Sequence, residues 1–259
     1  MVQKIRIRYA KRGRLRFASH RDFARALERA VRRAGLPIAY SAGFSPHPKI
    51  SYVGASPTGV ASEAEYAELS LARRMDPQQL RRDLDAVLPD GFDIVDAVEA
   101  KSGNIADRID VSRWRIELPG VAPEELRSAV AKFTAADEVL VERLTKQGRR
   151  TLDVRAAVHS ITVPDGDDDP TRPSPVSDSA PNTSAPEPVS EPPCAILDVV
   201  VRHVTPSVRP DEVLAGLRVV AGLVPPSPVR ATRLAQGTLT EHGEIADPLA
   251  ADRDVVPQR

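Results

Sequence analysis

The side chains that could take part in chemistry gather near the start of the chain, in two short motifs: Ser19-His20-Arg21-Asp22 and Gly43-Phe44-Ser45-Pro46-His47-Pro48. The first motif has the residue types of a catalytic triad, but neighbours on a helix point about 100° apart and cannot relay a proton among themselves. We therefore weigh two other roles for it. A helix N-terminus with free N–H groups, flanked by His20 and Arg21, would bind phosphate or carboxylate. Alternatively, the motif is a plain capping box with a solvent-exposed histidine.

The second motif predicts a stiff loop. Each proline favours an extended conformation in the residue before it, and Gly43 permits a tight bend. Such a loop would hold Phe44 and His47 at fixed positions. Phe44 could stack on a nucleic-acid base, but we expect it to anchor the loop in the core. His47 could contact a ligand or act as an acid or base, or it could simply be exposed.

Four arginines form what we call the arginine ridge: Arg21, Arg25, Arg29 and Arg32. Their spacings of 4, 4 and 3 place them on one side of a helix, opposite an apolar stripe. Glu28 is the one acid in this helix beyond its first turn. Residues 1–60 hold 13 Lys or Arg and only two acids, a net charge of +11, although the whole chain is neutral. This block indicates an anionic partner, namely nucleic acid, a phosphorylated metabolite or an acidic protein, and we favour a binding role for the ridge over a merely solvated surface.

Two acids on one strand, Glu63 and Glu65, point to the same side, and we expect them to pair with the arginine ridge. They could also share a metal ion with His20 and His47, but no local ligand spacing supports a metal site, and we predict none. The sequence contains no P-loop, dinucleotide fingerprint or nucleophile elbow. We therefore predict no bound cofactor, and whether the protein catalyses a reaction stays open.

The periodicity of the first half predicts a β-α-β-β-β-α-β order. Ser19 suits the N-cap of a helix and Gly35 its C-terminal cap. The expected strands are residues 4–9, 36–41, 50–55, 63–71 and 92–98, and the expected helices are residues 19–34 and 76–88.

The second half repeats this plan with an insertion. We expect strands at 113–118, 139–144, 151–158, 196–204 and 229–235, and helices at 123–135 and 210–220. Residues 164–193 are rich in proline and acids and should be disordered. Residues 237–259 lack periodicity and should form a loose tail. The sequence thus predicts an α+β protein made of two tandem ferredoxin-like (split β-α-β) halves with antiparallel sheets, residues 1–105 and residues 106–163 plus 194–236.

The first hundred residues resemble a known family, the radical-SAM-associated domain of unknown function. The residues that carry the resemblance are Arg16-Phe17, Ser19-His20, Asp22, Glu28-Arg29-Ala30, Arg32-Arg33-Ala34, Leu36-Pro37, Tyr40-Ser41, Gly43-Phe44, Pro46-His47-Pro48, Ser51, Gly59, Ser62, Glu63 and Glu65. The chain departs from the pattern at Ser56-Pro57, where relatives favour Leu-Pro, and at Glu68, where Asp is usual. The resemblance implies a radical SAM protein as partner, fused or separately encoded, but no activity. With one cysteine, Cys194, this chain alone cannot ligate an iron–sulfur cluster.

Three functions follow as expectations. The leading one is an accessory or substrate-binding subunit of a separately encoded radical SAM enzyme, acting in RNA binding or modification. The second is a metal-independent endoribonuclease that uses His20 or His47. The third is an accessory that binds a small molecule or a protein. The sequence shows neither a signal peptide nor a stretch of about 20 apolar residues. We therefore expect a cytoplasmic protein without a membrane partner.

Overall fold

The computed structural model describes residues 1–101, 103–145, 148–164 and 192–253. Its first half contains four strands and two α-helices, and its sheet has the order β4-β1-β3-β2. The elements are β1 (Gln3–Lys11), the 3-10 helix η1 (Gly13–Phe17), α1 (His20–Arg33), β2 (Ile50–Val53), β3 (Ala61–Leu71), α2 (Pro77–Asp85) and β4 (Ile94–Glu99).

The second half has four sheet strands in the order β10-β5-β9-β8. After η2 (Ile105–Arg108), its elements are β5 (Val111–Pro119), α3 (Pro123–Ala135), β6 (Leu140–Thr145), β7 (Gly148–Asp153), α4 (Val154–Ala157), β8 (Val158–Thr162), β9 (Cys194–Arg202), α5 (Pro210–Ala221) and β10 (Arg230–Leu239). The β6–β7 hairpin forms a separate two-stranded sheet. The strand predicted at 139–144 therefore pairs with β7 outside the main sheet, and residues 154–157 of the strand predicted at 151–158 form α4 instead.

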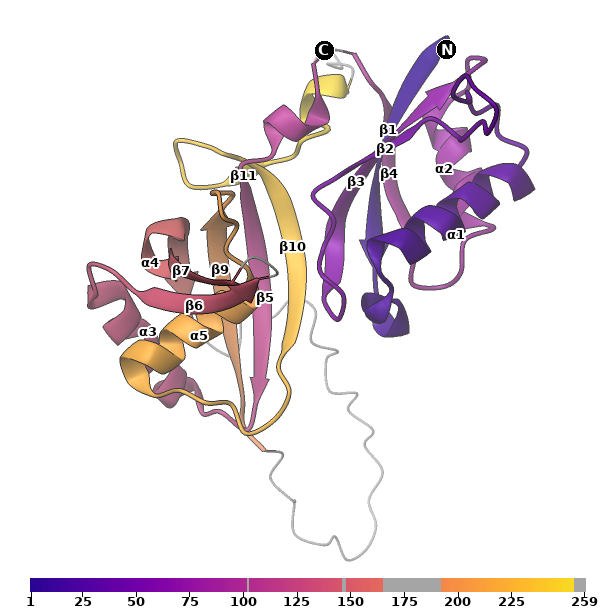
Figure 1. The fold of residues 1–259 in the computed structure, drawn as a ribbon. Coiled ribbons are helices and arrows are strands. Elements are labelled where there is room, and N and C mark those ends of the chain that lie inside the picture. Colours follow the sequence, from indigo (N-terminus) through magenta and orange to yellow (C-terminus); the bar gives the residue numbers. More distant parts are fainter. Residues whose placement is uncertain (102, 146–147, 165–191, 254–259) are drawn as a thin grey trace, which may run out of the picture.

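The two halves join through one pair of strands. Most of the ladders are antiparallel, but β3 and β10 pair in parallel, with Ala61 opposite Thr232 and Ser62 opposite Arg233. This pairing makes a single large sheet, and we call the junction the seam. Helices α1 and α2 lie on the side of the first half that faces away from the second half, and α3 and α5 lie on the opposite outer side (Figure 1). The fold is therefore α+β, with a large and mostly antiparallel sheet.

Each half has its own apolar core beneath its helices. In the first half, Phe23, Leu27 and Val31 of α1 pack on Ile5 and Ile7 of β1. The ring of Phe23 stacks on that of Tyr9, with centroids 3.8 Å apart. These residues recur at helical spacing in α1, so its apolar stripe faces the sheet and its arginines face solvent.

The predicted strand at residues 36–41 is wrong. Only isolated bridges form there, between Ile38 and Leu71 and between Tyr40 and Pro48. Tyr52 and Ile50 of β2 instead pair with β3, so β2 already covers the edge of β3 beside this segment. An apolar run next to a proline predicted a strand, but the sheet edge was already occupied.

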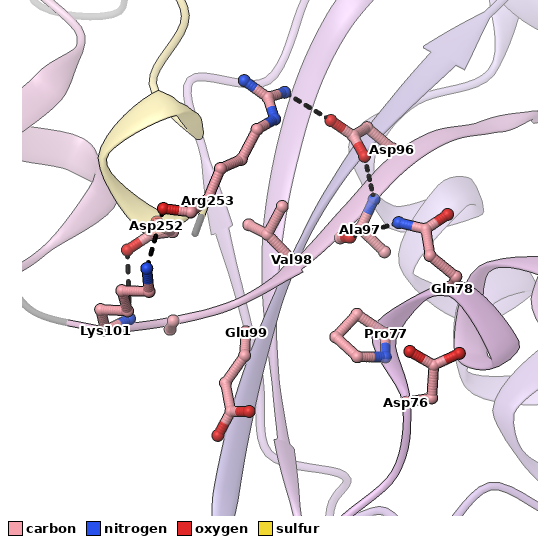
Figure 2. A pocket seen from close by; sticks show the side chains of 11 residues that line it. Asp76, Pro77, Gln78, Asp96, Ala97, Val98, Glu99, Lys101, Asp252 and Arg253 are labelled. Atoms are coloured by element: carbon pink, nitrogen blue, oxygen red, sulfur yellow. Dashed lines mark hydrogen bonds and ion pairs between the residues drawn. The ribbon is translucent and has the colours of Figure 1, made fainter. Parts of the chain in front are cut away.

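The C-terminal segment differs from the loose tail that we expected. Strand β10 continues to Leu239, β11 (Ile245–Ala246) pairs with it, and a 3-10 helix, η3 (Ala250–Asp252), follows. Leu249 is fully buried, and Arg253 forms an ion pair of 2.6 Å with Asp96 on β4 (Figure 2). These contacts are long-range, which explains why periodicity did not reveal them. The expected disorder of residues 164–193 concerns a segment of which all but residues 164, 192 and 193 lie outside the described residues.

Candidate functional site

The N-terminus of α1 is closed by a complete capping box. The Ser19 hydroxyl accepts a hydrogen bond from the Asp22 backbone N–H, and the Asp22 carboxylate accepts one of 2.9 Å from the Ser19 backbone N–H. The Ser19 hydroxyl also donates to this carboxylate at 2.7 Å, and this hydrogen bond, together with the one from the Ser19 backbone, lowers the pKa of Asp22. The predicted capping role is thus confirmed. Because the Asp22 carboxylate already supplies the negative charge that suits a helix N-terminus, a bound anion is less favoured there.

The arginine ridge lies on the exposed side of α1, as predicted. All four of its members are exposed, and Arg32 pairs with Glu28 at 3.7 Å. Within the part of the chain that the structure describes, Arg21, Arg25 and Arg29 form no ion pair. An exposed i,i+4 pair contributes only a few tenths of a kcal/mol. The ridge therefore presents almost its full positive charge to solvent.

Several basic residues on β1, or just after it, are paired with acids, unlike those of the arginine ridge. Lys4 and Arg6 on β1 both bind Glu68 of β3, at 2.6 and 3.0 Å. Arg12, just after β1, binds Glu63 and Asp93. These three cations are thus compensated by acids from outside the first sixty residues. The excess charge of the +11 block consequently concentrates on α1 and its flanking segments.

The loop of residues 41–48 is closed by its own hydrogen bonds. The Ser41 backbone N–H donates to the His47 carbonyl at 2.9 Å, and the Ser41 hydroxyl accepts from the His47 backbone N–H at 3.0 Å. Gly43 has a φ of +123°, as a tight bend requires, and Pro46 and His47 are exposed.

Phe44 does not anchor this loop. Its side chain is fully exposed, so the expected packing into the core is wrong. The hydrogen bonds between Ser41 and His47, together with the bridge between Tyr40 and Pro48, hold the loop without a buried aromatic side chain. An aromatic ring is therefore presented to solvent 12 positions after Arg32, the last member of the arginine ridge.

Glu63 and Glu65 do not pair with the arginine ridge, contrary to our expectation. Glu63 binds Arg12 at 2.7 Å, and Glu65 binds Arg233 of β10 at 3.1 Å. The ridge points away from the sheet, whereas both glutamates lie on β3 within it. Glu65 is 2% exposed, and it also accepts a hydrogen bond from the Ser56 backbone N–H.

A small hollow brings three of the predicted residues together. Ser19, His20 and Glu65 line it with Lys11, and its volume is only about 10 Å³. The His20 ring packs edge-on against Tyr52, with centroids 4.8 Å apart. Arg16 lies apart from this hollow, with its guanidinium over the Phe17 ring at 4.7 Å. The hollow is too small for an organic ligand. His20 and Glu65 therefore line the same space but do not form a substrate pocket.

Two further features bear on the kind of site. Among the described residues, no group of three or more His, Cys, Asp or Glu could hold a metal ion, so His20, His47, Glu63 and Glu65 do not form one. None of the helices in the described ranges is long and apolar enough to cross a membrane.

A cavity of about 620 Å³ lies where the C-terminal segment crosses β4 (Figure 2). Its polar groups bind one another. Asp96 binds Arg253, the Lys101 backbone N–H binds Asp252, and Gln78 donates to the Ala97 carbonyl. These contacts attach the segment to the first half, and we regard them as structural.

Sequence reasoning missed a second cavity, at the seam. Ser112, His203, Arg233 and Gln236 line it, together with a loop of the first half. Ser112 and His203 are 91 positions apart but make a hydrogen bond. No local spacing could have revealed them, because β5, the end of β9 and β10 meet only in the folded sheet.

A known protein family matches most of the chain. A family described as "Uncharacterized protein conserved in bacteria (DUF2344)" matches residues 4–210. No curated protein matches the chain. The matched range covers the arginine ridge, the loop of residues 41–48 and most of the second half. The family description gives no activity and names no partner.

Proposed function

The chain belongs to the DUF2344 family of uncharacterized bacterial proteins, and we propose that it binds single-stranded RNA on α1 and the loop of residues 41–48. The exposed ring of Phe44, in the segment that follows the arginine ridge, is the observation that carries this proposal. Proteins that bind single strands combine a positively charged track for the backbone with aromatic side chains on which bases stack. Both parts occur here within 27 residues, from Arg21 to His47.

The distribution of charge supports the same surface. Arg21, Arg25 and Arg29 form no ion pair with any described residue, whereas Lys4, Arg6 and Arg12 are neutralised within the sheet. Unpaired, solvated cations release counterions from a phosphate backbone, and this release drives non-specific binding. Sequence-tolerant recognition of single strands is therefore the best fit.

We also propose that the two halves are tandem ferredoxin-like units. In both strand orders, β4-β1-β3-β2 and β10-β5-β9-β8, the fourth, first, third and second sheet strands of the half follow one another. Helices follow the first and third sheet strands in each case. Many RNA-handling modules use a four-stranded sheet with helices on one side, but this analogy concerns only the fold.

The deciding experiment measures the affinity for a fluorescent single-stranded RNA by anisotropy at several salt concentrations. We expect the logarithm of the binding constant to fall linearly with the logarithm of salt, by about 0.7 for each phosphate contacted. The double variant Arg25→Ala/Arg29→Ala should bind every sequence more weakly, and its slope should be shallower by about 1.4.

The matched control removes the same charge from the other half. Lys132 and Arg218 are exposed on α3 and α5 and form no ion pair with the described residues. Lys132→Ala/Arg218→Ala should leave both affinity and slope unchanged. Equal weakening by the two double variants, or no binding at low salt, would exclude the arginine ridge as the RNA surface. Cleavage of the RNA in the presence of a metal chelator would instead indicate the endoribonuclease alternative with His20 or His47.

The partner belongs to the same proposal. We propose that a separately encoded radical SAM enzyme acts on the RNA that this chain binds, because the resemblance of the first hundred residues implies such a partner. Affinity purification from the native host, under conditions that preserve weak complexes, should recover a radical SAM protein. If it repeatedly recovers none, the accessory role with small molecules or proteins becomes the better hypothesis.

A further inference from the structure

The cavity at the seam has a volume of about 460 Å³, within the range of small-molecule sites. Its walls come from both halves. The first half contributes the loop of residues 54–58, and the second half contributes Ser112, Trp114, His203, Arg209, Arg233 and Gln236. None of the described residues that line it is an acid. We call it the seam pocket.

The loop of residues 54–58 is fixed in place by buried charges. Arg233 donates to the Gly54 carbonyl, Glu65 accepts from the Ser56 backbone N–H at 2.9 Å, and Lys11 donates to the Pro57 carbonyl at 3.0 Å. All three charged side chains belong to residues that are at most 5% exposed. Burying charged groups is costly, and here they hold one wall of a pocket in a defined position.

The electrostatic balance beside the pocket is positive. Arg233 and Lys11 share a single buried carboxylate, that of Glu65. The guanidinium of Arg233 lies 4.6 Å over the Trp114 ring, and its Nε is buried without a hydrogen-bond partner. Arg209 adds an exposed guanidinium at the rim. Two arginines without an acid in the lining favour a negatively charged ligand.

The rim also offers neutral donors. Within the described part of the chain, the hydroxyls of Thr58 and Ser207 make no hydrogen bond, and both residues are exposed at the pocket. Deeper in the pocket, Ser112 Oγ lies 2.7 Å from His203 Nε2 and 3.4 Å from Gln236 Oε1. The donors of Arg209, Thr58 and Ser207 thus lie at the exposed rim, whereas Ser112, Gln236 and Arg233 are buried.

We propose that the seam pocket binds a small organic molecule by its oxyanion, a phosphate or a carboxylate. Arg209 and the hydroxyls of Thr58 and Ser207 hold the anion, and Ser112, His203 and Gln236 contact the neutral polar part of the molecule. This site is separate from the arginine ridge and does not depend on RNA binding.

His203 provides a direct readout of occupancy. Burial, and then the charge of Arg233, lower the pKa of its imidazole, while Asp110 and a hydrogen bond with the Ile109 backbone act in the opposite direction. The lowered pKa favours the neutral ring, whereas an anion that binds nearby favours the protonated ring and changes its chemical shifts. Isotope-labelled histidine in the full chain allows the His203 signals to be followed by NMR.

The test titrates inorganic phosphate and, separately, acetate at constant pH and ionic strength. We expect a saturable shift of the His203 signals with one of the two probes, and little change at His159 and His242. Arg209→Ala should weaken this binding at least tenfold. Arg218→Ala, which removes a charge from α5 outside the pocket, should not change it.

The outcomes separate the ligand classes and the two proposals. Saturation by phosphate assigns a phosphorylated ligand, and saturation by acetate assigns a carboxylate. No saturable shift, or an equal shift in Arg209→Ala, overturns the seam pocket as an anion site. Arg209 is exposed, so its replacement should leave the fold intact, and circular dichroism checks this. The affinity of Arg209→Ala for single-stranded RNA should equal that of the unchanged protein, so failure of either proposal is recognised independently.

Discussion

At the scale of single residues, the exposure of Phe44 is the most informative feature of the first half. Phe23, in the neighbouring helix, is buried against Tyr9 and Phe92. Phe44 has no such contact and is fully exposed. Truncation of Phe44 removes no buried apolar surface, whereas truncation of Phe23 does, so the two phenylalanines should differ in their effect on stability.

We predict that Phe44→Ala weakens the binding of single-stranded RNA about tenfold, because stacking on one base contributes roughly 1–3 kcal/mol. The slope of affinity against salt should stay the same, since stacking releases no counterions. The melting temperature should also stay the same. Anisotropy and thermal unfolding measure these quantities.

Phe23→Ala is the contrasting variant. It removes a buried ring and should lower the free energy of unfolding by about 3–5 kcal/mol. If Phe44→Ala destabilises the protein to a similar extent, then the loop packs on the core in solution. If it leaves RNA affinity unchanged, the ring is not a stacking platform.

At the scale of elements, α1 depends on its capping box. Ser19→Ala removes the hydroxyl that caps the helix, and we expect a loss of about 1 kcal/mol in the free energy of unfolding. For a chain of this size, such a loss lowers the melting temperature by roughly 2–4 °C. Ser51→Ala, at an exposed position of β2, should have almost no effect. Equal losses in the two variants would argue against the capping role.

The contribution of Asp22 to the capping box depends on pH. Hydrogen bonds from Ser19 lower the pKa of Asp22 below its value in the unfolded chain. The Asp22 carboxylate therefore stabilises α1 fully above the unfolded pKa of about 3.9, and this contribution is lost as the pH falls through the lower folded pKa. Ser19→Ala should raise the pKa of Asp22, which NMR of the carboxyl carbon can measure.

Local pattern explains why most elements could be predicted. The limits of α3, 123–135, match the prediction, and α1 begins directly after its predicted N-cap. The predictions were wrong where contacts with other segments of the chain, and not the local pattern, decide the structure. Residues 36–41 carry a strand-like pattern, but β2 occupies the adjacent edge of β3. Strands β6 and β7 pair with each other, but no pattern within them indicates whether they join the main sheet.

The residues of the candidate site also divide into those that a local pattern predicts and those that come together only in the folded chain. The exposure of the arginine ridge followed from its spacing along one helix. The partner of Glu65, by contrast, is Arg233, 168 positions away, and the pairing exists only because β3 and β10 meet at the seam. The seam pocket could not be inferred from the sequence for this reason, since each of its walls lies on a different segment.

At the scale of the whole molecule, the C-terminal segment is attached to β1 and η2 through Asp252. Asp252 on η3 is completely buried as a side chain, and it binds Arg6 of β1 and Arg108 of η2, both at 2.7 Å. The Lys101 backbone N–H donates to the same carboxylate at 3.1 Å. The C-terminal segment thus contacts both β1 and the residues between Lys101 and Arg108 that link the two halves.

Asp252→Ala should therefore be among the most destabilising single changes in this protein. Arg6 and Arg108 would lose a shared carboxylate, and the side chain of Arg6 is only 2% exposed. Removing one partner from a buried ion pair costs about 3–5 kcal/mol. Because Glu68 still binds Arg6, we expect a value of about 3 kcal/mol in urea unfolding at pH 7.

Asp137→Ala is the matched control, because Asp137 is exposed and forms no ion pair within the described residues. The difference between the two variants should depend on pH. Burial acts to raise the pKa of Asp252, but hydrogen bonds from Arg108, the Lys101 backbone and Arg6 outweigh it and lower the pKa. The stabilisation is therefore complete above the unfolded pKa of about 3.9 and disappears as the pH falls through the lower folded pKa. The effect of Asp252→Ala should accordingly shrink at acid pH. A loss no greater than that of Asp137→Ala at pH 7 would show that the C-terminal segment does not stabilise the protein in solution.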